Sequence, residues 1–188
     1  MWRKTYPYLV AQIMEGYRRD SGSALELGPF SGGISLELAR LYPGFDITIA
    51  DESAEVVRYL EKEIRAAGLA RVIQVRETDL EHLAFGDSRF DLVVFRGAFF
   101  FLPGRENLLP EIFRLLRDGG MAFVGGGYGK GIPQQLIDEI RDETRVLNER
   151  LGRRWLSIKE LQEMVTRSQL SDNCKIGQEG GVWLNIRK

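Results

Sequence analysis

A glycine-rich segment near the N-terminus holds the residue types best suited to bind a ligand. It reads Glu26-Leu27-Gly28-Pro29-Phe30-Ser31-Gly32-Gly33 and lies between an apolar run, Ala24–Leu27, and an apolar-periodic stretch that begins at Ile34. Glycines let the backbone approach a ligand closely, and a helix that begins after the turn presents free N–H groups to a carboxylate or phosphate. The pattern therefore predicts a ligand-binding turn between a strand and a helix.

A second acidic position follows the next predicted strand. Asp51 comes directly after the run Asp46–Ala50. At the end of the second strand of such a unit, an acidic side chain can accept hydrogen bonds from both hydroxyls of a ribose. The glycine-rich turn and Asp51 together predict a ligand that contains a nucleoside.

The carboxylate of Glu26 narrows the choice of nucleoside ligand. A dinucleotide site follows the pattern G-x-G-x-x-G, whereas this turn has an acid two residues before its first glycine, Gly28. A carboxylate at the end of the strand would repel a pyrophosphate and attract an ammonium group. We therefore expect a ligand with an ammonium group rather than a dinucleotide.

The elements that position these residues alternate between helical periodicity and short β-branched runs. We predict strands at 24–27, 46–50, 72–75, 90–95, 121–124, 174–177 and 182–186, with helices in the intervals and a first helix from about Pro7 to the Asp20-Ser21-Gly22 segment. Crossovers of helical length make the strands mostly parallel, while the last two are close enough for an antiparallel hairpin. The expected fold class is α/β: a doubly wound, Rossmann-like sheet, mostly parallel with an antiparallel C-terminal edge hairpin and helices on both faces.

The composition limits the classes of protein to which this chain can belong. The 188 residues, 44% apolar and 28% charged, are typical of one globular domain. No apolar run approaches the roughly 20 residues of a membrane-spanning helix, and the first residues lack the apolar core of a signal peptide. A net charge of −1 provides no general attraction to nucleic acid, and one cysteine and one histidine leave a zinc site without its usual ligands. We expect a soluble cytoplasmic protein with no nucleic-acid or membrane partner and no metal.

From about Leu25 to Val124 the sequence resembles the class I S-adenosylmethionine-dependent methyltransferases, in particular the small-molecule group with short, single-domain chains. The resemblance rests on ordered landmarks: the first motif Glu26–Gly32, Asp51 after strand two, Asp79-Leu80 after strand three, the strand Phe90–Val94, and Leu115–Gly120 before strand five. Each landmark is weak alone, and their order is specific to the superfamily. It implies an enzyme that methylates a small molecule and releases S-adenosylhomocysteine.

The resemblance also implies how the methionine part of the cofactor is held. Gly28, Pro29, Phe30 and Gly32 would wrap it, with Glu26 beneath it near the amino group. Phe30 stands where the family usually has a second glycine. Its ring must turn away from the cofactor or narrow the pocket.

The resemblance implies that the nucleoside part of the cofactor lies at the ends of strands two and three. The resemblance implies that Asp51 binds the ribose hydroxyls and that Glu52 lies beside the adenine. Asp79 would accept a hydrogen bond from the adenine amino group, and the backbone N–H of Leu80 would meet a ring nitrogen.

Residues after strands four and five would line the reacting end. Arg96 and Gly97 belong there by the resemblance, and Arg96 would meet an anionic substrate, the carboxylate of the cofactor, or a structural ion-pair partner. The Gly125–Gly131 loop is expected to be a mobile substrate lid with Tyr128 facing the pocket, or else a flexible turn. The single domain 1–188 then divides into an N-terminal covering helix in 1–22, a cofactor-binding core in 23–126, and a lid loop, helices and hairpin in 127–188.

The sequence leaves alternatives open. Methyl transfer requires alignment and exclusion of water, and a general base is optional, so no catalytic residue is assigned. A module that binds S-adenosylmethionine or S-adenosylhomocysteine without transferase activity is one alternative, suggested by Phe30. A nicotinamide-dependent reductase is disfavoured because no tyrosine has a lysine four residues later. The sequence names neither the methyl acceptor nor the pathway, nor whether the protein is a monomer or a homodimer.

Overall fold

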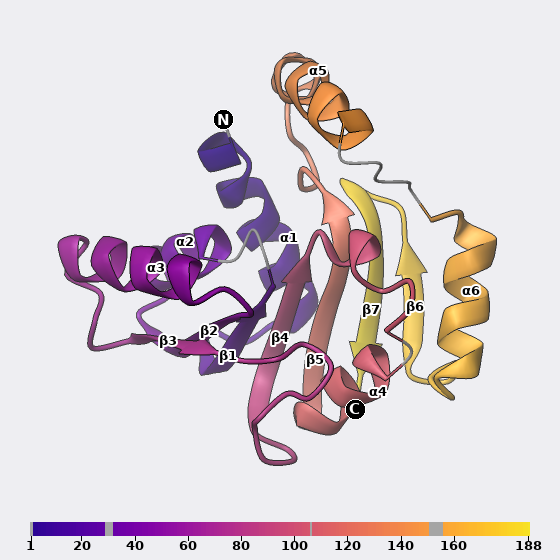
Figure 1. Cartoon of the computed structure of the whole chain (residues 1–188), viewed down its shortest axis with the longest axis horizontal. Coiled ribbons are helices and arrows are strands. Elements are labelled where there is room, and N and C mark those ends of the chain that lie inside the picture. The colour runs from indigo at the N-terminus through magenta and orange to yellow at the C-terminus, as the bar shows by residue number, and fades with distance from the viewer. Residues whose placement is uncertain (1, 29–31, 106, 151–155) are drawn as a thin grey trace.

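A computed structural model of the chain describes residues 2–28, 32–105, 107–150 and 156–188, without the side chains of 142–144 and 147–149. The described residues form one seven-stranded sheet in the order β3-β2-β1-β4-β5-β7-β6 (Figure 1). The strands are β1 (Ser21–Leu27), β2 (Gly44–Asp51), β3 (Ile73–Glu77), β4 (Phe90–Arg96), β5 (Leu116–Gly127), β6 (Cys174–Gly177) and β7 (Gly181–Arg187). β1 to β5 are parallel, and β7 is antiparallel to both β5 and β6. The predicted fold class is confirmed.

Helices cover both faces of this sheet. They are α1 (Tyr6–Tyr17), α2 (Gly33–Leu41), α3 (Ala54–Ala66), α4 (Leu108–Leu115), α5 (Gln134–Arg150) and α6 (Ile158–Arg167), with short 3₁₀ turns at Trp2–Lys4 and Ala98–Phe100. Successive side chains of a strand point to opposite faces. In β4, Leu92 and Val94 therefore pack into the core under α1, α2 and α3, while Val93 and Phe95 pack into the core under α4 and α6. Helix α5 stands beyond the carboxyl ends of β4 and β5 (Figure 1). None of the helices in the described residues is long and apolar enough to cross a lipid bilayer.

Two helices begin with a serine that caps the first turn. Ser53 precedes α3, and its hydroxyl accepts a hydrogen bond from the N–H of Val56 at 3.3 Å. Ser157 and Glu160 form a reciprocal capping box at the start of α6. These caps satisfy N–H groups that have no partner inside the helix.

Two strands are longer than their sequence patterns indicate. β5 begins at Leu116 and continues to Gly127, so the segments Asp118–Gly120 and Gly125–Gly127, predicted as a turn and a loop, belong to the strand. β1 begins at Ser21, where the sequence indicates only the end of a helix. In both places the backbone finds a partner far along the chain: Gly127 pairs with Gly181, and Ser21 with Gly44. Ladder hydrogen bonds override the weak strand propensity of glycine and serine.

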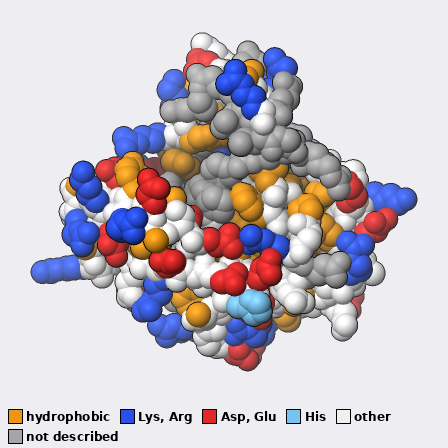
Figure 2. Space-filling model, in the orientation of Figure 1, with side chains coloured by type: hydrophobic (Ala, Val, Ile, Leu, Met, Phe, Trp, Pro, Cys, Tyr) orange, Lys and Arg blue, Asp and Glu red, His pale blue; other side chains and the backbone are white. Residues whose placement is uncertain are grey.

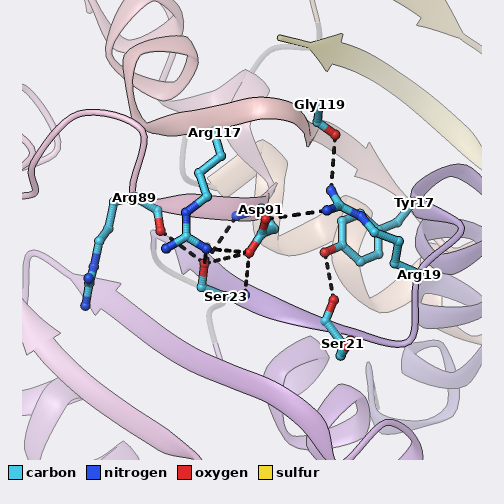
Figure 3. A network of polar contacts seen from close by, with 8 residues as sticks. All are labelled: Tyr17, Arg19, Ser21, Ser23, Arg89, Asp91, Arg117 and Gly119. Carbon is cyan, nitrogen blue, oxygen red and sulfur yellow. Dashed lines mark hydrogen bonds and ion pairs between the residues drawn. The ribbon is translucent and has the colours of Figure 1, made fainter.

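An ionic network ties the amino ends of β1, β4 and β5 together (Figure 3). The Asp91 carboxylate accepts hydrogen bonds from the Ser23 N–H and from Arg117 Nη1, each at 2.8 Å, and lies 3.6 Å from Arg19 Nη1. Arg19 also donates to the carbonyl of Gly119 at 3.1 Å. Burial alone would raise the pKa of Asp91, but the hydrogen bonds from Ser23 and the charges of Arg117 and Arg19 outweigh it, so this pKa is lowered. The network fixes the register of the three central strands.

Candidate functional site

The predicted site residues gather at the carboxyl edge of the sheet, around the point where the strand order reverses between β1 and β4. Open α/β sheets bind ligands at this point, because the connections diverge there and leave a crevice. Glu26 comes from β1, Asp51 from β2 and Arg96 from β4. Glu26 pairs in register with Val94, two residues before Arg96, so the two charged side chains emerge on the same face of neighbouring strands.

Glu26 is a buried carboxylate that the structure satisfies only in part. Its side chain is 2% exposed, and Oε2 accepts a hydrogen bond from the N–H of Ser35 at 2.8 Å. Oε1 is buried and has no hydrogen-bond partner among the residues that the structure describes. Burial raises the pKa of Glu26, and hydrogen bonds from Ser35 and from the backbone N–H groups of Gly32 and Ile34 oppose that rise without cancelling it. The side chain takes up the N-terminal N–H groups of α2 and leaves one oxygen for a donor or a cation.

The backbone conformation of the glycine-rich turn requires glycine at two positions. Gly28 and Gly32 have φ values of 86° and 98°, in the left-handed region that favours glycine. A Cβ at Gly28 would overlap the ring of Phe95, and one at Gly33 would overlap the ring of Tyr6. Backbone conformation and packing within the protein therefore account for the glycines of this turn. The predicted roles of Pro29 and Phe30 lie outside the described residues.

The end of β2 places two acidic residues in different environments. Asp51 is 2% exposed, and its Oδ1 accepts a hydrogen bond from the N–H of Ser53 at 2.9 Å. Glu52 is exposed and forms a two-pronged ion pair with Arg105, at 2.9 and 3.3 Å. Glu52 Oε1 also accepts a hydrogen bond from the N–H of Leu80 at 3.2 Å. In this structure the N–H that was predicted to meet the adenine ring is therefore held by Glu52.

A cavity of about 490 Å³ opens where β2 and β3 end, and it is lined by Glu52, Glu77, Thr78 and Asp79. Acidic side chains surround a basic one near the middle of this face (Figure 2). Asp79 is exposed, and its pKa is lowered chiefly by the hydrogen bond from the N–H of Glu81. A site with this charge attracts hydroxyl and amino groups and repels phosphates.

Arg96 lies at the other side of the reversal point, at the end of β4. It is 7% exposed, and its guanidinium lies 3.9 Å from the centroid of the Trp2 ring. The Tyr128 ring stacks on the Trp2 ring, with 5.6 Å between the two ring centroids. Burial lowers the pKa of Arg96, while the charges of Tyr6, Glu26 and Tyr128 oppose that effect. Gly97, with a φ of 78°, donates its N–H to the carbonyl of Gly125 at 2.6 Å and turns the chain away from the sheet.

The segment predicted to be a lid is bound to the rest of the fold. Gly125 to Gly127 are in β5, and the N–H groups of Tyr128 and Gly129 both donate to the carbonyl of Gly180, at 2.8 and 2.9 Å. Lys130 Nζ forms ion pairs with Glu15 at 3.0 Å and with Glu179 at 3.4 Å. Tyr128 stacks on Trp2, from a segment held by α1 and by the turn between β6 and β7, and its place at the reacting end stays a prediction.

Sequence reasoning missed three residues of this site: Trp2, Tyr6 and Arg105. Trp2 is held in place because its carbonyl accepts hydrogen bonds from the Thr5 N–H at 2.9 Å and the Thr5 hydroxyl at 2.8 Å. The density of aromatic residues before the first helix was the one available signal for Trp2 and Tyr6. Nothing in the sequence pairs Arg105 with Glu52.

Comparisons with known proteins agree on the core of the chain. A family model described as "Methyltransferase domain" matches residues 25–124. The chain is 29% identical over 98 residues to the demethylmenaquinone methyltransferase of Lactobacillus johnsonii, and 30% identical over 118 residues to the carboxy-S-adenosyl-L-methionine synthase of Dichelobacter nodosus. These alignments cover 52% and 62% of this chain but 40% and 49% of the relatives, so the chain spans less than half the length of either.

A solved structure matches almost the whole chain. It comes from Methanococcus maripaludis and is described as a candidate S-adenosyl-L-methionine-dependent methyltransferase. The TM-score is 0.86 at 26% sequence identity, and the match covers 98% of this chain and 85% of the other. The likeness therefore includes the elements outside residues 25–124.

Proposed function

The chain belongs to the methyltransferase domain family, the class I S-adenosylmethionine-dependent methyltransferases, and on that premise we propose that it transfers a methyl group from S-adenosylmethionine to a small-molecule acceptor. The observation that carries the proposal is the buried Glu26 carboxylate at the strand reversal, with one oxygen bound to α2 and the other without a partner. An unpaired buried carboxylate oxygen is costly, and a ligand that supplies a donor there gains the corresponding free energy.

The residues present fit this cofactor. An ammonium group, such as that of the methionine part, matches Glu26 Oε1 in charge and in hydrogen bonding. A dinucleotide fits poorly, because the Glu26 carboxylate already takes up the N-terminus of α2 where a pyrophosphate would bind. The backbone of Gly28 and Gly32 would follow the methionine part, and the parts assigned to Pro29 and Phe30 stay predictions.

The nucleoside would lie across the ends of β2 and β3. We assign the ribose hydroxyls to Asp51, whose carboxylate is fixed by Ser53. The adenine would occupy the cavity beside Glu52 and Asp79, with Asp79 accepting from its amino group. For Leu80 to donate to an adenine nitrogen, Glu52 must release that N–H and keep only its ion pair with Arg105.

When bound, the cofactor supplies a methyl group on a positively charged sulfur that leaves as a neutral thioether. The chain itself has to align the acceptor and exclude water at the reacting end. Trp2 lies over Arg96 at the end of β4, Tyr128 stacks on Trp2, and Tyr6 lies against Gly33. We assign the exclusion of water to these three rings. Burial raises the pKa of Tyr6, with Arg96 opposing and Glu26 reinforcing that shift, so its phenol serves as a hydrogen-bond donor and not as a base.

Calorimetric titration with S-adenosylmethionine and S-adenosylhomocysteine tests the proposal, with NADH as the comparison ligand. We expect both sulfur compounds to bind and NADH not to bind. Asp51→Ala should weaken binding at least about 30-fold, since a buried acceptor for two hydroxyls is lost. Asp46→Ala, at the exposed opposite end of β2, is the matched control and should bind normally. Binding of NADH alone would refute the assignment.

Turnover separates the transferase from a module that only binds the cofactor. A broad screen of small acceptors, read out as S-adenosylhomocysteine formation, should find at least one substrate. Tight cofactor binding with no turnover on any acceptor would favour the binding module. A cytoplasmic location and the absence of a nucleic-acid partner rest on composition alone and stay predictions.

A further inference from the structure

Arg96 is a buried cation without an anion. Its side chain is 7% exposed, and no hydrogen bond or ion pair joins its guanidinium to any residue in the described part of the chain. The Nε atom in particular is buried with no partner. Structural arginines at strand ends are expected to pair with a carboxylate, and this one does not. An unpaired buried guanidinium indicates a missing anionic ligand.

The surroundings of Arg96 determine from which direction an anion can bind. The Trp2 ring covers one face of the guanidinium at 3.9 Å, and Tyr128 backs Trp2. Stacking of this kind leaves the N–H donors of a guanidinium available, because they lie in its plane. An anion must therefore approach the edge of the guanidinium. The planar fork of two N–H groups matches a carboxylate.

Glu26 does not serve as this anion. It emerges on the same face of the neighbouring strand, but no ion pair joins it to Arg96, and its Oε2 is turned toward Ser35 of α2. Burial raises the pKa of the Glu26 carboxyl, which the charge of a well-paired arginine would lower. Glu26 and Arg96 therefore each keep a buried polar atom with no hydrogen-bond partner among the described residues, and each suits a ligand group of opposite charge.

We infer that Arg96 binds a carboxylate of the methyl acceptor, so that the substrate class is small carboxylic acids. This inference rests on the proposed function. The strand order places the nucleoside residues on β2 and β3, Glu26 on β1, and Arg96 beyond them on β4. The groups around Arg96, Trp2 and Tyr128, come from the N-terminal segment and from the end of β5, away from the nucleoside cavity. An anion at Arg96 would also offset the positive charge of the guanidinium next to a cationic sulfur.

The test observes Arg96 directly in the intact protein. In ¹⁵N-labelled protein saturated with S-adenosylhomocysteine, sodium acetate is added while the arginine Nε–H signals are followed, and Arg96→Lys identifies the signal of Arg96. Acetamide is the neutral probe of the same shape, and sodium chloride controls for ionic strength. We expect a saturable shift of the Arg96 signal with acetate and none with acetamide or chloride. No shift with acetate overturns the inference.

A second arm distinguishes the acceptor from the carboxylate of the cofactor. The free protein is titrated with S-adenosylhomocysteine and with its decarboxylated analogue, by calorimetry and by the Arg96 signal. We expect similar affinities, and acetate binding that persists with S-adenosylhomocysteine in place. If only the carboxylated compound shifts the Arg96 signal and it blocks acetate, Arg96 binds the cofactor and the assignment of the acceptor is wrong. Failure of both compounds to bind in calorimetry would instead contradict the proposed function.

The substrate screen gives the corresponding functional result. Carboxylic acids are paired with their carboxamides, and turnover should be confined to the acids. For the best acid, Arg96→Lys should lower kcat/KM at least about 30-fold, because the planar fork is lost, while the KM for S-adenosylmethionine stays within about threefold. Equal turnover of an acid and its amide would overturn the inference.

Discussion

The N–H of Ser35 donates a hydrogen bond of 2.8 Å to the carboxylate of Glu26, so strand β1 supplies the anion that the N-terminus of α2 would otherwise take from a ligand. Helix N-termini at this position commonly bind phosphate. Here the position is occupied from within the chain, and Oε1 of the same carboxylate, which has no hydrogen-bond partner among the described residues, is the proposed point of recognition. One side chain thereby reverses the charge preference of the turn.

Glu26→Gln should stabilise the ligand-free protein and weaken cofactor binding. Gln keeps an oxygen for Ser35 but carries no charge to bury, so the free energy of unfolding at pH 8 should rise by about 1–2 kcal/mol. Because the charge opposite an ammonium group is lost, the affinity for S-adenosylhomocysteine should fall at least about tenfold. Chemical denaturation and calorimetry measure the two effects. Glu37→Gln is the control, because Glu37 is also on α2 but is paired with Arg40.

The pH dependence should run in opposite directions for stability and for binding. The pKa of Glu26 is raised in the folded state by burial, so its contribution to stability is present below the ordinary pKa of glutamate and is lost as pH rises through the folded pKa. Binding of an ammonium group needs the ionised carboxylate. Below the folded pKa, the affinity for S-adenosylhomocysteine should therefore fall about tenfold for each pH unit, and the Glu26 carboxyl should release a proton when the ligand binds.

Calorimetry between about pH 5 and 8, in buffers of different ionisation enthalpy, measures both the affinity and the proton release. The Glu26→Gln protein should show neither dependence. A wild-type affinity that is constant over this range would mean that Glu26 does not titrate on binding.

Asp91→Ala should destabilise the fold without affecting cofactor binding. The side chain is 13% exposed and holds Ser23, Arg117 and Arg19, so its removal should cost about 2–4 kcal/mol. The pKa of Asp91 is lowered in the folded state, so this stabilisation is present above the ordinary pKa of aspartate and is lost as pH falls through the folded pKa. Denaturation at pH 7 and at low pH measures it. Normal affinity for S-adenosylhomocysteine below the melting temperature is expected, because Asp91 lies at the amino end of β4 and the candidate site lies at the carboxyl ends of the strands.

Gly33→Ala should displace the N-terminal segment from the site. The added Cβ would overlap the ring of Tyr6, and crowding of this kind typically costs about 1–3 kcal/mol. In a double-mutant cycle, Tyr6→Ala should relieve most of that cost, because the overlapping ring is gone. Strictly additive effects of the two substitutions on the free energy of unfolding would show that Tyr6 does not pack against the start of α2.

Much of the fold is predictable because its signals are local. Alternating periodicities identify the helices and most strands, and the hydroxyls of Ser53 and Ser157 mark two helix starts. The same local patterns place Glu26 and Asp51 at strand ends. Where a segment has weak propensity, as in Gly125–Gly127, its structure depends on a partner strand that no local pattern reveals.

The sequence by itself determined the order of the elements, the carboxyl edge as the place of the candidate site and the acidic residues that lie at that edge, since each follows from periodicity and turn chemistry over a few neighbouring residues. Only the tertiary structure decided which residues become partners. Arg105 pairs with Glu52, the Trp2 ring lies over Arg96, and the Tyr128 N–H donates to the carbonyl of Gly180. These contacts join residues far apart in the chain. They depend on how strands and loops meet at one edge of the sheet, and burial at that edge determines which charges find a partner within the protein and which are left for a ligand.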